Sequence, residues 1–287
     1  ELSENYDKWG TETYIVLDET FNDTSKKIEK FANVMKKLPF EPKLTGYIRA
    51  DLIASRKKDW DNLISMGFCS HFYGVESFNN ASAKAIGKGM NTGRLQDGLI
   101  EVKEYFNKHA GYYKGHLSLI AGLPHETLDT LRETKRWVDT YWKGNPYQMS
   151  VLMIKDLNVF PTELSHYSKM DKAWDEYGYK KVPFDPENKG IYTGNYPWYQ
   201  SLYDLIKSGA YLSWDSGNMT TYDALKWLSE EFLHTEYIDP FVVDHYFVDP
   251  NVTWKDIARM NYTEMGPDRY ELINKHIESY INNKTTN

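Results

Sequence analysis

Short β-rich runs alternate with amphipathic helical stretches over the first half of this chain, and that alternation most constrains how it can fold. Parallel strands need crossover connections between them, usually helical, and these crossovers are nearly always right-handed. The sequence therefore predicts an α/β fold of consecutive parallel strands with outer helices, either a barrel or an open sheet. The expected strands are residues 14–17, 44–50, 68–75, 115–121 and 147–154.

The alternation stops near residue 157, and the second half of the chain differs in composition. Tyr, Trp, Asp and Asn become frequent there, and prolines mark loops. Helical spacing of apolar residues returns over 222–234, 254–260 and 268–281. We therefore expect two parts. They are a parallel α/β domain at residues 1–157 and a loop-rich, mainly helical extension or lid at residues 158–287.

The charge and the cysteine content argue against several classes of protein. The formal net charge is −7 with acidic and basic residues interleaved, so no basic stripe is available to neutralise nucleic-acid phosphates. No apolar run approaches the roughly 20 residues that a membrane-spanning helix needs. A single cysteine, Cys69, excludes an internal disulfide framework and favours a reducing compartment, so we expect a cytoplasmic protein.

Polar residues follow four of the expected strands, at the point where each strand ends. Ligands of parallel barrels and open parallel sheets gather at these carboxyl ends. A carboxylate or hydroxyl after a strand also serves as the N-cap of the next helix, so each position alone has a purely structural interpretation. Their recurrence at one rim favours a binding site. The residues are Asp18, Glu19, Thr20, Arg49, Asp51, Glu76, Ser77, Gly122 and Glu126.

Four motifs carry these residues: Tyr14-Ile-Val-Leu-Asp-Glu-Thr-Phe21, Gly46-Tyr-Ile-Arg-Ala-Asp51, Phe72-Tyr-Gly-Val-Glu-Ser77 with Ile86-Gly-Lys-Gly89, and Gly122-Leu-Pro-His-Glu-Thr127. Their order and spacing resemble the radical S-adenosylmethionine (radical SAM) superfamily over roughly residues 12–170, closest to the branch with cobalamin-dependent members and methylthiotransferases. The resemblance implies a partial TIM-like barrel of parallel strands, here lacking its first strand. It also implies that S-adenosylmethionine lies across the carboxyl ends of the strands.

The resemblance assigns roles to individual positions. Asp18, Glu19 and Thr20 match the segment that holds the methionine amino group of S-adenosylmethionine, an ammonium that needs clustered acceptors. Glu76 and Ser77 match the position that contacts the ribose hydroxyls. A carboxylate suits that task because it can accept from two adjacent hydroxyls at once.

Two positions match the strand that approaches the adenine in the family, Gly122 and Glu126. The longer superfamily pattern places its glutamate one residue earlier, where His125 stands in this sequence. Glu126 has a second interpretation, as a carboxylate favoured by the dipole of the helix that follows it.

Arg49 also has two interpretations. Relatives often place a residue that touches cofactor or substrate at this position, and an arginine at a strand end can bind a carboxylate through two hydrogen bonds. Alternatively, Arg49 forms an internal salt bridge. The candidate partners for that salt bridge are Asp51, Asp18 and Glu76.

One departure from the family decides what the chain can do alone. The superfamily binds a four-iron, four-sulfur cluster through three closely spaced cysteines, whereas this chain has only Cys69, expected to be a buried thiol within a strand. The chain also begins at Glu1 and enters a strand-like run almost at once. We therefore expect a fragment, inert by itself, of an enzyme that cleaves S-adenosylmethionine and modifies an unknown substrate by radical chemistry. The resemblance leaves cobalamin binding by an upstream domain open.

Two other functions fit the same residues. A non-catalytic module would keep a nucleoside or S-adenosylmethionine site without the cluster. An unrelated TIM-barrel hydrolase would use Asp18, Glu19 and Glu76 as paired carboxylates. The expected partner in each case is a small molecule. In addition, the unpaired edge of the first strand favours pairing with a second chain in a dimer.

Overall fold

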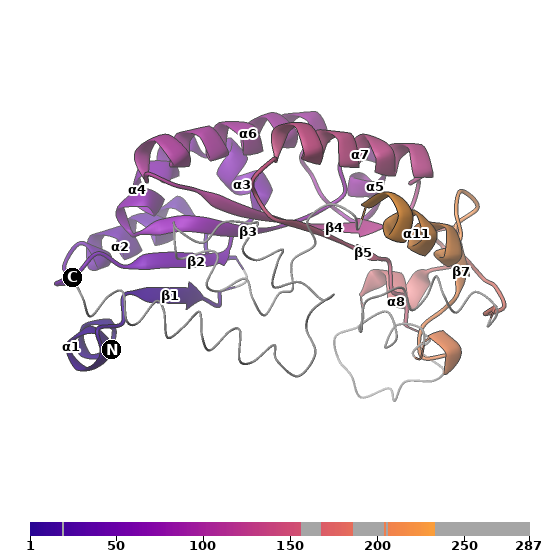
Figure 1. Ribbon diagram of the computed structural model, residues 1–287, viewed down its shortest axis with the longest axis horizontal. Helices are drawn as coiled ribbons and strands as arrows, with labels where there is room; N and C mark the ends of the chain where they lie inside the picture. The colour runs from indigo at the N-terminus through magenta and orange to yellow at the C-terminus, as the bar shows by residue number, and fades with distance from the viewer. Residues whose placement is uncertain (19, 156–167, 186–203, 205, 233–287) are drawn as a thin grey trace.

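Five parallel strands form one sheet in the computed structural model, which describes residues 1–18, 20–155, 168–185, 204 and 206–232 (Figure 1). The strand order is β1-β2-β3-β4-β5, and each strand pairs in parallel with the next. The five strands predicted from the sequence are therefore confirmed. Their bounds are β1 Thr13–Val16, β2 Lys43–Tyr47, β3 Phe68–Glu76, β4 Lys114–Ala121 and β5 Tyr147–Val151.

The helices between the strands lie along one face of this sheet (Figure 1). The fold is thus the expected α/β arrangement, consistent with a partial TIM-like barrel. One expected helix, over residues 52–64, is divided because Arg56 departs from helical backbone geometry (φ −114°, ψ 63°). The elements are α2 Ser25–Met35, α3 Ala50–Ser55, η1 Lys57–Asp59, α4 Trp60–Ser65, α5 Asn80–Ala85, α6 Thr92–His109 and α7 Leu128–Tyr141.

Alternate residues of the strands face these helices and form the core. In β3 the buried ring of Tyr73 contacts Trp142, just after α7, with ring centroids 6.5 Å apart. The indole nitrogen of Trp142 donates to the backbone oxygen of Gly115 in β4 (3.0 Å). Leu99 of α6 is completely buried in the same layer. Because burial of apolar surface is the dominant favourable term in folding, this layer fixes the position of the strand ends.

Two elements differ from the sequence-based expectation. Helix α1 (Leu2–Trp9) precedes β1, where the sequence suggests only a short lead into a strand. The ring of Tyr6 in this helix stacks on Phe40, with ring centroids 4.4 Å apart. In the second half, β6 (Lys180–Lys181) and β7 (Trp214–Asp215) pair antiparallel as a small second sheet. Both elements are short, so local patterns carry little signal for them.

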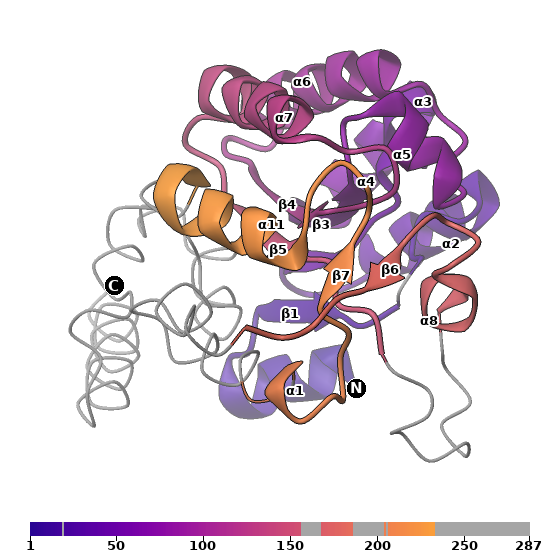
Figure 2. The same cartoon turned by 90° about the vertical axis from the view of Figure 1, so that its right-hand side faces the viewer.

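The second half of the chain is described in part. Helix α11 (Thr221–Trp227) and the turn η3 (Leu228–Phe232) confirm the described part of the helix predicted over 222–234. Figure 2 shows α11 beside β5, and a short helix α8 (Lys169–Ala173) below β6. Outside the described residues lie the domain boundary predicted at residue 157 and the helices predicted over 254–260 and 268–281.

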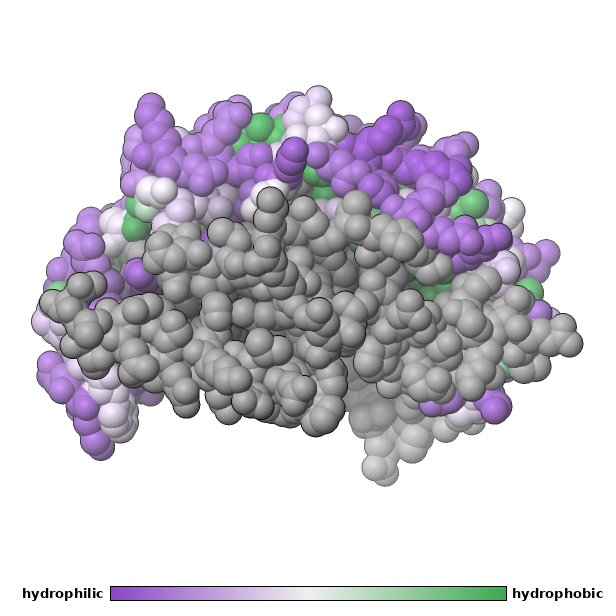
Figure 3. Space-filling model, viewed as in Figure 1, coloured by the Kyte–Doolittle hydropathy of each residue, from purple (hydrophilic) through white to green (hydrophobic). Residues whose placement is uncertain are grey.

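Hydrophilic side chains dominate the surface over α6 and α7 in Figure 3. Within the described ranges, the model contains no helix with the length and apolar character needed to cross a bilayer.

Candidate functional site

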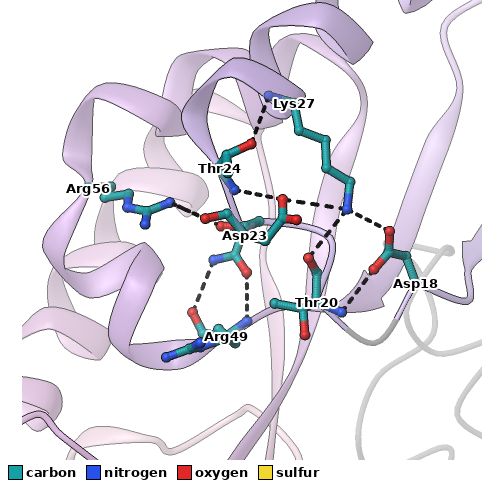
Figure 4. Close-up of polar contacts among 8 residues, drawn as sticks. Asp18, Thr20, Asp23, Thr24, Lys27, Arg49 and Arg56 are labelled. Carbon is teal, nitrogen blue, oxygen red and sulfur yellow. Dashed lines mark hydrogen bonds and ion pairs between the residues drawn. The ribbon is translucent and has the colours of Figure 1, made fainter.

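The segment after β1 is held by Lys27 of α2 (Figure 4). Its ammonium nitrogen lies 2.6 Å from Asp18 Oδ2 and 3.6 Å from Asp23 Oδ1, and it donates to the backbone oxygen of Thr20 (3.4 Å). Asp18 also accepts from the backbone N–H of Thr20 (3.0 Å). The hydrogen bond from Lys27 lowers the pKa of Asp18, and the bond from Thr20 adds to the effect. Asp18 and Thr20 therefore lie together at the rim, while Glu19 lies outside the described residues.

Asn22 joins the end of β1 to the end of β2. Its Oδ1 accepts from the backbone N–H of Arg49 (2.8 Å), and its Nδ2 donates to the backbone oxygen of Arg49 (3.0 Å). Arg56 then donates to the backbone oxygens of Asn22 (3.3 Å) and Asp23 (2.9 Å). A side-chain amide has both a donor and an acceptor, so it can replace a peptide group in such a ladder. Sequence reasoning missed Asn22, whose only signal is its place directly after the first motif.

The side chain of Arg49 forms a two-point ion pair with Asp51. The distances are 3.1 Å from Nε to Oδ1 and 2.6 Å from Nη2 to Oδ2. Burial raises the pKa of Asp51, but the hydrogen bond and charge of Arg49 outweigh burial and lower it overall. Of the partners proposed for Arg49, the structure shows Asp51. Both side chains remain open to solvent, at 53% and 31% exposure.

Glu76 ends β3 in a strained backbone conformation. Its φ is +68°, which residues other than glycine rarely adopt. The carboxylate lies over Gly74, where a Cβ atom would sit 2.8 Å from Oε1. The ammonium of Lys88 lies 3.6 Å from Oε1 and donates to the backbone oxygen of Gly74 (2.8 Å). Burial raises the pKa of Glu76, and the charge of Lys88 opposes the rise. A half-buried carboxylate of this kind is suited to accept hydrogen bonds from a ligand.

Glu126 joins the ends of β3 and β4. Its Oε1 accepts from the hydroxyl of Ser77 (2.5 Å), and its Oε2 accepts from the backbone N–H groups of Gly122 (2.9 Å) and Leu123 (3.1 Å). The residue is 2% exposed. Burial raises the pKa of Glu126 to about 7, although the three hydrogen bonds act in the opposite direction. Glu126 thus fixes the position of Ser77 and of the backbone after β4.

Gly122 is enclosed by aromatic side chains from the second half of the chain. Its φ is +94°, and a Cβ atom there would lie 2.3 Å from the ring of Trp214. The hydroxyl of Tyr179 donates to the backbone oxygen of Gly122 (2.5 Å), and the indole of Trp214 donates to that of Leu152 (2.8 Å). Only glycine fits this combination of backbone conformation and close approach. Sequence reasoning did not connect Tyr179 and Trp214 with this rim, because they are far away along the chain.

A pocket of about 360 Å³ opens between the ends of β2 and β3 and the starts of α3 and α6. Its polar lining includes Arg49, Asp51, Ser77 and Lys88. That volume lies at the small end of the range for ligand sites. The structure therefore brings Arg49 and Ser77, which follow different strands, to one pocket, and Ser77 is bonded in turn to Glu126.

A second pocket, of about 600 Å³, lies near the opposite end of the strands and is lined in part by Cys69 and Tyr112. The sulfur of Cys69 lies 2.8 Å from the hydroxyl of Tyr112, and burial raises the pKa of the thiol. A four-iron, four-sulfur cluster needs several thiolates, and the sequence has one cysteine. The described residues also contain no group of three or more His, Cys, Asp or Glu side chains that could hold a metal ion. The residues of this chain do not fit the cluster.

No protein-family model and no curated protein sequence matches the chain. Among solved structures, the radical SAM methyltransferase TsrM from Kitasatospora setae, with cobalamin and a [4Fe-4S] cluster bound, aligns over 64% of this chain and 33% of its own, with 14% identity and a TM-score of 0.48. The cobalamin-dependent S-adenosylmethionine radical enzyme OxsB aligns over 51% of this chain and 22% of its own, with 19% identity and a TM-score of 0.42.

Coproporphyrinogen III oxidase (HemN) from Escherichia coli, a radical SAM enzyme, aligns over 56% of this chain and 39% of its own, with 16% identity and a TM-score of 0.36. This chain thus spans less than two fifths of the length of each of these enzymes. All three belong to the superfamily that the sequence motifs resemble.

Proposed function

We propose that this chain forms the S-adenosylmethionine-binding part of a radical SAM enzyme, with its site at the carboxyl ends of β1 to β4. In intact enzymes of this kind, reductive cleavage of the bound cofactor supplies a radical that acts on the substrate. The residues of this chain contribute binding and orientation. Because the chain has a single cysteine, it is inert by itself, and the cluster ligands must come from outside this sequence.

Backbone strain at one rim is the observation that carries this proposal. Among the described residues, two that are not glycine have positive φ, Glu76 and His125, each at +68°. Glu76 ends β3, and His125 lies just after β4, so both belong to the same pair of neighbouring strand ends. Such conformations cost about 1–3 kcal/mol each and cluster at functional sites.

The donors and acceptors at this rim suit a nucleoside with a charged tail. The carboxylate of Glu76 can accept from both hydroxyls of a ribose. The guanidinium of Arg49 can bind a carboxylate, as the one on the methionine part of the cofactor. The pocket beside them also has an apolar side, which includes Val75 and Met90 and suits a base. Asp18 and Glu76 each lie beside a lysine, so nothing here favours the paired carboxylates of a hydrolase.

Calorimetric titration of the purified chain with S-adenosylmethionine tests the proposal. We expect saturable binding that Glu76→Gln weakens about tenfold, because the amide has lost one acceptor and its charge. The matched control is Glu133→Gln, since Glu133 is a highly exposed glutamate of α7 that lies away from the rim. Absence of binding, or equal binding by Glu76→Gln and the wild type, would contradict the proposal.

Inertness of the chain has its own test. After anaerobic reconstitution with iron and sulfide, we expect no stoichiometric cluster, because one thiol cannot replace three. Iron and sulfide in a four-to-four ratio per chain, with the visible absorbance of a cluster, would show this part of the proposal to be wrong.

A further inference from the structure

The two faces of the sheet are lined differently. In β3, Tyr73 points to the helix-covered face, where its ring contacts Trp142. Successive residues of a strand point to opposite faces, so the neighbouring Phe72 points away from the helices. The helix-free face therefore carries the side chains of Phe72 and of the residues opposite it in the adjacent strands.

Three ring side chains form one row across this face. In the parallel register Tyr47 lies opposite Phe72, and Phe72 lies opposite His116. The ring centroids are 5.3 Å apart in both pairs, and the planes are inclined by 31° and 35°. Rings at this spacing attract one another and restrict each other's orientation. The row therefore holds the ring of Tyr47 at a fixed angle to the sheet.

The row is buried at one end and open at the other. His116 is 2% exposed, whereas Tyr47 is 47% exposed. Beside Tyr47, the neighbouring chain segment of β1 exposes Ile15 and Leu17, the latter at 79%. Ile15 lies opposite Thr45, two residues before Tyr47, and so shares its face. Single exposed apolar side chains are ordinary, but three on adjacent strand ends form a patch that calls for a ligand.

The patch, defined here as Ile15, Leu17 and Tyr47, adjoins the candidate site. Tyr47 is the last residue of β2 and precedes Arg49 by two residues. Phe72, on which its ring rests, precedes Gly74 by two residues, and the carboxylate of Glu76 lies over Gly74. A ligand on the patch would thus have a flat apolar surface beneath it and a carboxylate within the same strand ends.

We infer that this patch binds a flat aromatic or heteroaromatic ring, which stacks on Tyr47 and packs against Ile15 and Leu17. The fixed angle of the tyrosine ring favours a planar ligand over an aliphatic one of equal size, because stacking needs two flat faces. Under the proposed function, on which this step rests, the ring belongs to the substrate that the radical would attack. The ring site itself stands on the described contacts alone.

Indole is the probe that tests the inference, with cyclohexanol as the non-planar control, and saturation-transfer NMR measures the binding of each to the whole chain. We expect indole to bind and cyclohexanol not to compete. Tyr47→Leu should weaken indole binding about fivefold or more, and Tyr47→Phe should keep it within about twofold, because the ring and not the hydroxyl makes the contact. The matched control is Tyr141→Leu, a tyrosine of α7 that is 49% exposed and should leave binding unchanged.

Leu17→Asp is the second variant, since it alters a side chain that is almost fully in solvent and leaves the row of rings intact. It should also weaken indole binding. No indole binding, or equal binding by the wild type, Tyr47→Leu and Leu17→Asp, would overturn the inference. Titration of the same samples with S-adenosylmethionine separates the two proposals, because Tyr47→Leu should bind the cofactor like the wild type. Indole binding that depends on Tyr47, in a chain that does not bind the cofactor, would retain the ring site and reject the proposed function.

Discussion

The two halves of the rim are built in opposite ways. After β1 and β2, Asp18 and Arg49 form ion pairs with Lys27 and Asp51 that stay open to solvent. After β3 and β4, the carboxylate of Glu126 is buried and fully engaged by a hydroxyl and two backbone amides. Exposed ion pairs contribute about 0–1 kcal/mol, whereas unpaired buried polar groups cost about 1–3 kcal/mol each. The first half can therefore exchange its charges with those of a ligand, and the second half fixes the backbone on which the site stands.

Glu126→Ala should break this comparison most severely. Removing the carboxylate leaves the Ser77 hydroxyl and the amides of Gly122 and Leu123 buried without their partner. We expect the free energy of unfolding to fall by about 3–5 kcal/mol. Urea denaturation measures it, with Glu133→Ala as an exposed control expected to change it by less than about 0.5 kcal/mol. A loss below about 1 kcal/mol would mean that Glu126 does not hold the strand ends together.

Glu126→Gln should sharpen the comparison through its dependence on pH. Burial raises the pKa of Glu126 from 4.5 to about 7, so the folded state keeps a proton that the unfolded state has lost. Its contribution to stability is therefore complete below pH 4.5 and is lost as the pH rises through 7, a change of about 3 kcal/mol. The glutamine cannot ionise, so the variant should gain stability relative to the wild type by about that amount between pH 5 and pH 8.

Comparing the two proteins at each pH removes the contribution of other groups. Burial lowers the pKa of His71 from 6.5 to about 3, so its contribution is lost as the pH falls below 6.5, in both proteins alike. A stability difference between wild type and Glu126→Gln that does not change with pH would show that Glu126 titrates at the same pH in the folded and unfolded states.

Asn22→Ala should have an intermediate effect. The variant removes both hydrogen bonds to the backbone of Arg49 and so uncouples the end of β1 from the end of β2. We expect a loss of about 1–3 kcal/mol, measured by urea denaturation. Asn22→Asp keeps the acceptor for the Arg49 N–H and loses the donor, so it should fall between the wild type and the alanine variant. An effect of Asn22→Ala as small as that of an exposed substitution would rule out this coupling.

Lys27→Ala should have the smallest effect. Its ion pair with Asp18 is exposed, so the loss should be below about 1 kcal/mol and should shrink as salt is added. A double-mutant cycle with Asp18→Asn measures the coupling between the two side chains. Coupling as large as the loss in Glu126→Ala would mean that the two halves of the rim do not differ as described.

The sequence predicted the main sheet because its strands are apolar, separated by periodic helices and joined in chain order. It did not predict α1, which buries none of its residues and depends on the stacking of Tyr6 on Phe40. Nor did it predict the small sheet of β6 and β7, whose strands are two residues each and come from distant parts of the chain. Local patterns contain no information about such tertiary contacts.

The candidate site shows the same division. Motif positions placed polar residues at the strand ends, and the structure places them there. The partners of those residues could not be predicted, because Ser77 and Glu126 are 49 residues apart in the sequence and Tyr179 reaches Gly122 across 57. The opposite exposure of Arg49 and Glu126 is likewise set by packing, since both appear in the sequence only as charged residues after a strand.

Hydrogen–deuterium exchange with and without S-adenosylmethionine tests most directly whether the carboxyl-end rim is the cofactor site. The account predicts slower exchange of backbone amides in peptides that cover residues 74–80 and 120–127, at the ends of β3 and β4. It predicts no change in a peptide covering residues 66–70, beside the pocket at the opposite end of the strands. Slower exchange at residues 66–70 with none at 74–80, under conditions where calorimetry shows binding, would contradict it.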